Sequence, residues 1–198
     1  MKPELKLMQE IERAQDEVLL WVDLETTGLK PEDGDHVLEI AALFTDMSLV
    51  TIPGIYRKVY YSEYLHPVAA KYVIPPRVME MHTKNGLFAE IAAQMGALTF
   101  QMDEQDFLRW MRKTVPADVK VTMAGSSVHF DRRFIREYWP EVDKKLNYQL
   151  LDVRAFEYGW RACGQDVQPE RPTNHRALGD IIDALTKMRN YRRRLLCR

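Results

Sequence analysis

Two carboxylates, Asp23 and Glu25, follow directly after an apolar run from Val18 to Val22. An uninterrupted run of β-branched, aliphatic and aromatic residues is typical of a strand that is buried on both faces. On an extended backbone, residues two apart point to the same side, so we expect both carboxylates to face one point at the edge of the sheet. Two like charges there repel each other, and a hard divalent cation with oxygen ligands would relieve the repulsion. The pair alone leaves two interpretations open, a metal site or an ordinary strand that ends in acidic residues.

A third carboxylate, Asp131, follows the turn Gly125-Ser126-Ser127 and lies in the first turn of the helix expected there. A helix dipole stabilises a carboxylate at that position, and free backbone N–H groups nearby can receive a phosphate. Asp131 can serve a catalytic site near the strand end, or it can simply be a favourable charge at a helix start.

A fourth carboxylate, Asp180, borders the apolar stripe of the last expected helix, and His175 lies five residues before it. On a continuous helix that separation is about 140° round the axis, so the two side chains would point apart. Both can reach one site only if His175 belongs to the loop or cap ahead of the helix. A histidine on such a loop, beside a metal cluster, can act as a general base. Taken singly, either residue is also compatible with a packing or surface role.

Hydrophobic periodicity indicates the elements that must position these residues. Three strands are expected first, joined by short polar connections as an antiparallel meander, at 18–22, 36–46 and 55–61. The Ala and Leu content of 36–46 is also compatible with a helix. Later strands, at 119–124 and 148–153, alternate with helices, which are expected at 78–95, 101–114, 154–163 and 176–196, with one more between Ser127 and Pro140. This order predicts an α/β fold with a mixed sheet flanked by helices.

Length and composition indicate one globular domain, 17–198, preceded by an amphipathic leader helix over 1–16. No apolar stretch is long enough to cross a bilayer. The net charge of −1 argues against a protein that grips long nucleic acid through a broad basic face, but not against one that holds a short strand through metal ions. We expect a cytoplasmic protein without membrane contact, and its two cysteines, Cys163 and Cys197, to be free thiols.

Six short stretches form a pattern that is specific as a set. In chain order they are Trp21–Leu29, His82-Thr83 with Gly86-Leu87, Gly125–Phe134, Tyr138–Glu141, Leu151–Val153 and His175–Asp180. Together they resemble the oligoribonucleases, which belong to the DEDDh group of 3′-to-5′ exonucleases and have a ribonuclease-H-like fold. The resemblance covers most of residues 18–192 and implies that 17–198 is an exonuclease domain.

The resemblance implies two-metal hydrolysis of short single-stranded RNA to 5′-mononucleotides. Four carboxylates would hold two divalent ions, Mg²⁺ or Mn²⁺, which generate a hydroxide and stabilise the leaving 3′-oxygen. These carboxylates are Asp23, Glu25, Asp131 and Asp180. His175 would deprotonate the attacking water.

The resemblance also marks positions for the substrate. Leu29 would wedge against the terminal bases, and His82 and Ser127 would lie near the backbone and terminal phosphate of the substrate. Near Tyr148, the family caps the 5′-phosphate of a dinucleotide with an arginine and a serine that come from across a dimer interface. This implies a homodimer in which Tyr148 and Arg154 contact the substrate.

Three departures from the family pattern bear on substrate choice. Ser126 stands where the family has asparagine, and Arg77 where it has a base-stacking tryptophan. Gln149 and Arg154 stand where the family has the arginine and serine of the phosphate cap. Arg154 can restore a phosphate contact, whereas Gln149 carries no charge. The preferred substrate length and the dimer therefore stay open.

Two other functions stay open beside the exoribonuclease. One is a proofreading or repair exonuclease that acts on single-stranded DNA, and the other is a catalytically silent nucleic-acid-binding module. An unused cluster of buried like charges would cost stability, which argues against the silent module. The basic stretch from Arg189 to Arg194 either complements the end of a helix or steers phosphate, two roles that salt dependence would distinguish.

Overall fold

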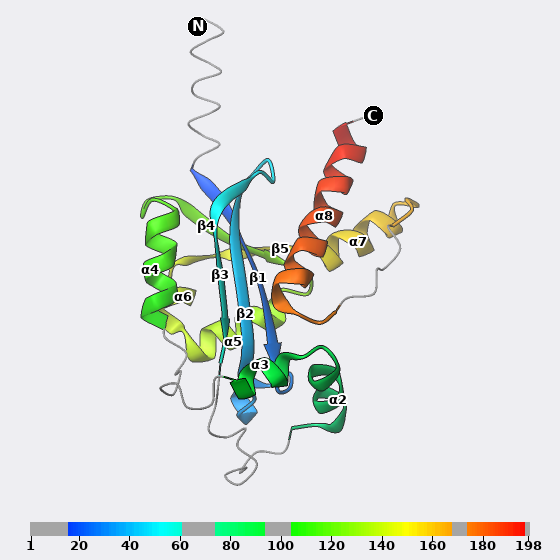
Figure 1. Ribbon diagram of the computed structural model, residues 1–198. Helices are drawn as coiled ribbons and strands as arrows, with labels where there is room; N and C mark the ends of the chain where they lie inside the picture. The colour runs from blue at the N-terminus through cyan, green and yellow to red at the C-terminus, as the bar shows by residue number, and fades with distance from the viewer. Residues whose placement is uncertain (1–15, 61–73, 94–103, 168–173, 197–198) are drawn as a thin grey trace, which may run out of the picture.

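A five-stranded mixed sheet lies at the centre of the computed structural model, which describes residues 16–60, 74–93, 104–167 and 174–196 (Figure 1). Its strands are β1 (Glu17–Thr26), β2 (Val37–Asp46), β3 (Thr51–Val59), β4 (Lys120–Gly125) and β5 (Leu146–Asp152), in the spatial order β3-β2-β1-β4-β5. β2 is antiparallel to both β1 and β3, whereas β4 is parallel to both β1 and β5. The predicted meander and mixed sheet are confirmed.

Helices cover both faces of this sheet. They are η1 (Pro31–Asp33), α2 (Pro76–Lys84), α3 (Leu87–Ala93), α4 (Glu104–Thr114), α5 (His129–Tyr138), α6 (Pro140–Asp143), α7 (Val153–Ala162) and α8 (Ala177–Leu196). Figure 1 shows α4, α5 and α6 on one side of the sheet, α7 and α8 on the other, and α2 and α3 beside the end of β1.

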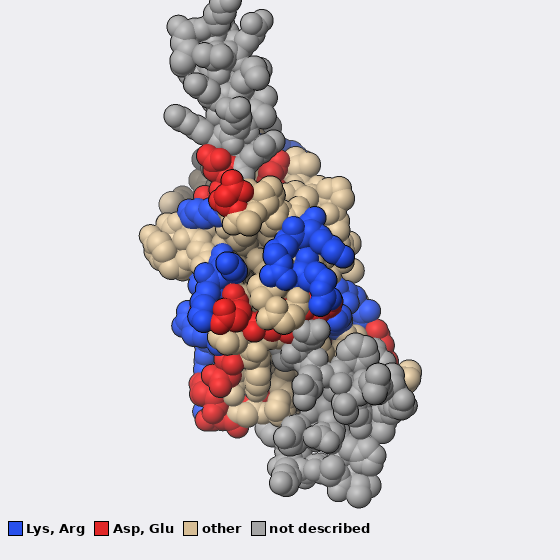
Figure 2. All heavy atoms as spheres, turned by 90° about the vertical axis from the view of Figure 1, so that its left-hand side faces the viewer, with Lys and Arg blue, Asp and Glu red and all other residues tan. Residues whose placement is uncertain are grey.

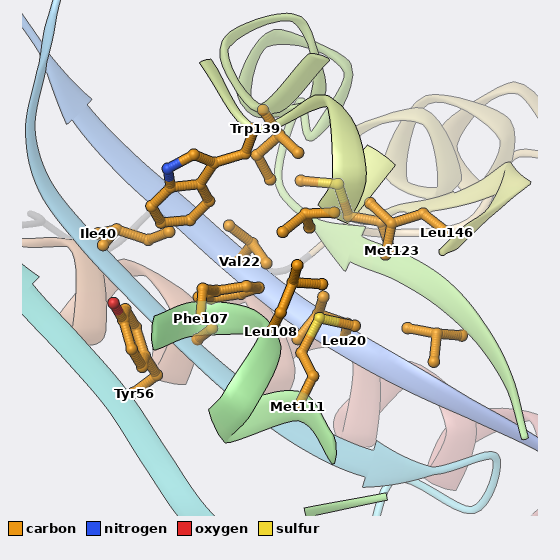
Figure 3. Close-up of a cluster of buried hydrophobic side chains, with 14 of the residues drawn as sticks. Leu20, Val22, Ile40, Tyr56, Phe107, Leu108, Met111, Met123, Trp139 and Leu146 are labelled. Atoms are coloured by element: carbon orange, nitrogen blue, oxygen red, sulfur yellow. The ribbon is translucent and has the colours of Figure 1, made fainter. Parts of the chain in front are cut away.

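One face of β1 packs on α4, α5 and α6. Leu20 and Val22 point into this layer, where they join Phe107 and Met111 from α4 and Trp139 from the α5–α6 junction (Figure 3). Leu20 and Trp139 have no exposed surface. The period of the apolar residues on α4 explains its orientation, because its buried residues recur on one side of the helix.

The other face of β1 packs on α8. Leu19 and Trp21 contact the apolar stripe of α8, which includes Ile181. Asp23 and Glu25 continue the same side of the strand, so they lie on the face that α8 covers. β1 runs through both carboxylates to Thr26 because β2 pairs with it over that length. The expectation that both carboxylates lie on extended backbone and face the same side is therefore confirmed.

Other element boundaries also differ from prediction. Of the segment 36–46, residues Val37–Asp46 form strand β2, which excludes the helical alternative. β3 starts at Thr51 rather than at 55, because Pro53 and Gly54 form a bulge that interrupts the alternation of the pattern. β5 starts at Leu146. The leader helix lies outside the described residues except for Asp16, as does Cys197, whereas Cys163 is a free, exposed thiol.

Charge on the surface is mixed. On the side that carries α4, Lys and Arg side chains gather in patches with Asp and Glu side chains beside them (Figure 2). Several of the basic groups are paired, for example Arg109 with Asp106 at 3.0 Å and Arg132 with Asp143 at 2.9 Å. In the described part of the chain, no helix has both the length and the apolar character that a membrane span requires.

Candidate active site

Three carboxylates converge on the α8 face of β1. Each of Asp23, Glu25 and Asp180 offers an oxygen, and these oxygens all lie within 4.8 Å of one another. Strand spacing brings the first two together. Asp180 reaches them because it lies in the first turn of α8, where the positive end of the helix dipole stabilises a carboxylate. The structure therefore brings three of the four predicted metal ligands close enough together to share one metal site.

The fourth predicted ligand, Asp131, reaches the same strand from the opposite layer. It lies in the first turn of α5, and its Oδ1 accepts a 2.8 Å hydrogen bond from the backbone N–H of Leu24. After burial, the charge of Asp131 is the largest cause that raises the pKa of Asp23. The four carboxylates thus meet around one short segment of β1.

Burial, together with repulsion from neighbouring carboxylates, makes three of these four groups difficult to ionise. Burial, followed by the charges of Asp131, Glu25 and Asp180, raises the pKa of Asp23 well above its usual value. Burial and the charges of Asp180 and Glu39 raise the pKa of Glu25 to about 8. The pKa of Asp131 is also raised to about 8, mainly by burial. Oxygen donors that repel one another in this way suit a hard divalent cation, which would relieve the repulsion.

His175 lies two residues before the first residue of α8 and is exposed. Its φ of 48° is in the left-handed region, which non-glycine residues rarely adopt. The side-chain amide of Asn85 donates a 2.5 Å hydrogen bond to the carbonyl oxygen of His175. His175 is therefore a loop residue and not part of the helix, as the five-residue spacing to Asp180 required.

His82 has no exposed surface, although the resemblance marked it as a substrate-contacting position. Its Nε2 lies 3.7 Å from Oε2 of Glu25, and the amide of Asn85 lies 3.3 Å from its Nδ1. Burial lowers the pKa of His82, which favours the neutral imidazole. In the structure, His82 is therefore a buried side chain that lies against the carboxylate of Glu25.

The turn that carries Ser127 is held by Asp152, which sequence reasoning missed. Ser127 has a positive φ of 58°, and its backbone N–H donates a 3.0 Å hydrogen bond to Oδ1 of Asp152. The same oxygen accepts from the backbone N–H groups of Arg154 and Ala155, so Asp152 also caps α7. An aspartate two residues before the start of a predicted helix was the available signal.

Leu29 projects from the loop after β1 and is 63% exposed. The backbone beside it is fixed by the buried Asp35, which accepts a 2.7 Å hydrogen bond from the backbone N–H of Lys30. A Cβ on Gly28 would lie 2.3 Å from both carboxylate oxygens of Asp35, so only glycine fits there. Leu29 is therefore an exposed apolar side chain on a well-anchored loop.

Tyr148 lies on β5, two strands away from β1, and Arg154 lies in the helix that follows β5. Tyr148 is on the edge strand β5 and is 84% exposed. Arg154 lies in the first turn of α7, and its guanidinium is 3.7 Å from the carboxylate of Glu157. Gln149 accepts a 3.1 Å hydrogen bond from the side chain of Asn147. The edge position leaves Tyr148 available to a partner.

Glu39 is a fifth carboxylate near the cluster, and sequence reasoning missed it. It is the cross-strand partner of Glu25 and has no exposed surface. It accepts hydrogen bonds from Arg57 at 2.7 Å and from Arg176 at 2.9 Å, so its charge is balanced by guanidinium groups. A single acidic residue inside the apolar run of β2 was the signal that could have identified it.

The basic stretch near the C-terminus is partly structural. Arg189 donates to the carbonyl oxygen of Leu49 at 2.8 Å, and Arg194 donates to the carbonyl oxygen of Asp166 at 2.8 Å. Arg192 is exposed. Two of the arginines thus fasten α8 to neighbouring loops.

Comparisons with known proteins fit this arrangement. The family model described as exonuclease matches residues 20–186. An oligoribonuclease of Nocardia farcinica is 34% identical over 182 residues, which cover 90% of this chain and 81% of its own. The human mitochondrial oligoribonuclease is 31% identical over 180 residues, which cover 88% of this chain and 71% of its own.

Solved structures show the same fold. A zinc-bound complex of Escherichia coli ExoI with single-stranded DNA has a TM-score of 0.60 to this chain at 17% identity, over 88% of this chain and 40% of that one. This chain thus spans about two fifths of that protein. The predicted ribonuclease-H-like α/β fold is confirmed.

Proposed function

The chain belongs to the oligoribonuclease family of exonucleases, and from this premise we propose that it is a 3′-to-5′ exoribonuclease acting on short single-stranded oligonucleotides. The products are 5′-mononucleotides. One observation carries the proposal at the level of the site. Carboxylates from β1, α5 and α8 converge at one segment of β1, although nothing in local structure requires these elements to meet there.

Asp23, Glu25, Asp131 and Asp180 hold two divalent ions, Mg²⁺ or Mn²⁺. The all-oxygen donor set and the raised pKa values of Asp23, Glu25 and Asp131 support this assignment. When bound, such ions activate water and offset the charge that develops on the phosphate and on the leaving oxygen. The carboxylates must release their protons to bind them, so activity rises with pH through the range in which they ionise.

His175 accepts the proton of the attacking water. It is exposed at the start of α8, within the same short stretch that supplies Asp180. Histidine is the side chain best suited to accept and return a proton at neutral pH, and such general-base help contributes roughly 10²–10⁴-fold to the rate.

The exposed side chain of Leu29 packs against the terminal bases, and the turn at Ser127 lies near the substrate phosphates. Apolar packing against a base is independent of its identity, which suits an enzyme that clears oligonucleotides of any sequence. Tyr148 and Arg154 contact the substrate of a second protomer, so the enzyme is a homodimer. The cytoplasm is the proposed location.

Digestion of 5′-labelled RNA and DNA oligomers, from dinucleotides to decanucleotides, tests the proposal. We expect shortening from the 3′ end with Mg²⁺ or Mn²⁺, none with a chelator, and faster digestion of RNA than of DNA. Asp23→Asn should be inactive and folded. Asp33→Asn is the matched control, because Asp33 is an exposed carboxylate on η1. An active Asp23→Asn protein would rule out the assigned site.

Substrate preference separates this proposal from its rival. The replacement of the family's tryptophan and arginine by Arg77 and Gln149 favours longer or deoxy substrates as a second candidate. Equal or faster digestion of DNA would keep the chemistry but assign the protein to proofreading or repair.

A further inference from the structure

Glu39 is the buried anchor of a polar network beside the candidate active site. Two guanidinium groups and one backbone amide donate to it: Arg57 at 2.7 Å, Arg176 at 2.9 and 3.1 Å, and the N–H of Ala177 at 3.2 Å. These contacts engage both carboxylate oxygens. The carboxylate of Glu39 is therefore occupied by these donors, although Glu39 lies opposite Glu25 on the neighbouring strand.

Arg176 connects this anchor to the start of α8. Besides Glu39, its guanidinium contacts Glu90 on α3 and approaches the carbonyl oxygen of Asn85 at 3.5 Å. Its own carbonyl oxygen accepts the N–H of Asp180 at 3.1 Å, which is the first hydrogen bond of α8 in this region. Arg176 thus fixes the position from which α8 begins.

Asn85 contacts His175, the residue that precedes Arg176. Its amide donates to the carbonyl oxygen of His175 at 2.5 Å, and its Oδ1 accepts the N–H of Leu87, which fixes the orientation of the amide. His175 has a φ of 48°. A non-glycine residue keeps such a conformation only when its surroundings impose it.

We propose that Glu39, Arg176 and Asn85 form a clamp that imposes the left-handed backbone of His175 and so directs its imidazole toward the acidic cluster. This inference rests on the proposed function, because it assigns His175 the proton transfer. The three clamp residues are positioning residues: they act on catalysis through His175. The clamp draws on β2, the α2–α3 connection and the segment directly before α8, so it requires all three to be packed together.

Arg176→Lys tests the clamp, because lysine keeps the charge but cannot make the two-point contact with Glu39. A misplaced catalytic group typically costs one to two orders of magnitude, so we expect kcat to fall roughly tenfold to a hundredfold. KM should change by less than about twofold, since substrate binding does not depend on His175. Arg57→Lys is the matched control: Arg57 contacts the same two carboxylates, Glu39 and Glu90, but it lies on β3 and is not adjacent to His175 in the chain.

The decisive measurement repeats Arg176→Lys in a His175→Ala background. If the clamp acts through His175, Arg176→Lys should lower kcat by less than about twofold in that background, because the effects of coupled residues are not additive. Equal losses in both backgrounds would overturn the inference, and so would equal losses in Arg57→Lys and Arg176→Lys. Mn²⁺ affinity, measured by titration calorimetry, should stay within about threefold of the parent protein in every variant. A larger loss in Arg176→Lys would mean that Arg176 acts through Asp180 and would also overturn the inference.

A second variant covers the case in which Arg176→Lys does not fold. Asn85→Ala removes the donor to His175 and should show the same dependence on the His175 background, and an additive effect would count against the clamp. The proposed function fails separately. It fails if the unmodified protein has no metal-dependent exonuclease activity. If the protein is active and His175→Ala slows it, additive losses of kcat in the double variants contradict the clamp alone.

Discussion

The backbone N–H of Leu24 donates a 2.8 Å hydrogen bond to Oδ1 of Asp131, which lies 107 residues further along the chain. Leu24 is the residue between Asp23 and Glu25, so the carboxylate from α5 is tied to β1 at the centre of the acidic cluster. The cluster is therefore held from both layers of the molecule, with α5 on one face of the sheet and α8 on the other.

Two substitutions of Asp131 can distinguish the effect of its charge from the effect of its hydrogen bond to Leu24. Asp131→Asn keeps an oxygen that can accept from Leu24 but removes the charge, so we expect turnover to be lost and the stability of the metal-free protein to be equal or higher. Asp131→Ala leaves the Leu24 donor without this acceptor, which costs about 1–3 kcal/mol relative to Asp131→Asn. Urea unfolding with a chelator measures the difference. Equal stability of the two variants would contradict the role given to the hydrogen bond.

The metal-free protein should become less stable as pH rises from about 5 to about 8. Glu25 and Asp131 have pKa values of about 8 in the folded protein, against ordinary values of 4.5 and 3.8. Between these limits the folded state holds protons that the unfolded chain has released. The stabilisation of the folded state by these bound protons is therefore complete below the ordinary pKa values and is lost as pH passes about 8. The free energy of unfolding falls by on the order of 1 kcal/mol per pH unit for each group.

Unfolding in urea across this pH range, with a chelator present, measures the slope. Glu25→Gln should flatten it, because that group no longer titrates. Stability that rose with pH in the metal-free protein would contradict the assigned protonation states.

Divalent ions should reverse this pH dependence. Metal binding needs ionised carboxylates, so Mn²⁺ should raise the melting temperature most at the alkaline end of the range and release protons when it binds. Calorimetric titrations in buffers of different ionisation enthalpy count the released protons. A binding enthalpy that did not depend on the buffer would mean that the carboxylates are already ionised without metal.

Truncation of Leu29 should weaken substrate binding without affecting the fold. The side chain is 63% exposed, so Leu29→Ala should change the free energy of unfolding by less than about 0.5 kcal/mol. Loss of packing against a base should raise KM for a dinucleotide roughly tenfold. Val50→Ala is the matched control, since Val50 is 62% exposed and lies in the turn between β2 and β3, whereas Glu39 lies near the other end of β2. An unchanged KM in Leu29→Ala would exclude contact with the bases.

Asp152→Ala should destabilise the protein by about 1–2 kcal/mol, because it removes the cap of α7. It also releases the N–H of Ser127, so the turn at Ser127 should lose its fixed orientation and KM should rise. Asp152→Asn keeps an acceptor oxygen and should recover most of the stability. If Asp152→Ala were as stable as the parent protein in urea, the capping contacts would not contribute as described.

The amino-acid sequence determined the elements and the chemical types of the site. An apolar run identified β1, and strand period placed Asp23 and Glu25 on one side. Helical period identified α4 and α8, and spacing required His175 to lie before α8. Each of these properties depends on residues within a few positions of one another, which is why periodicity predicts them.

Only the tertiary structure decided which faces meet. The convergence of Asp131 and Asp180 on β1 depends on α5 and α8 packing on opposite faces of the sheet. The burial of His82 behind Glu25 and the capture of Glu39 by Arg176 depend on contacts between residues far apart in the chain. Hydrophobic period shows that a helix has a buried face but not what covers that face, because the partner is set by packing of the whole core.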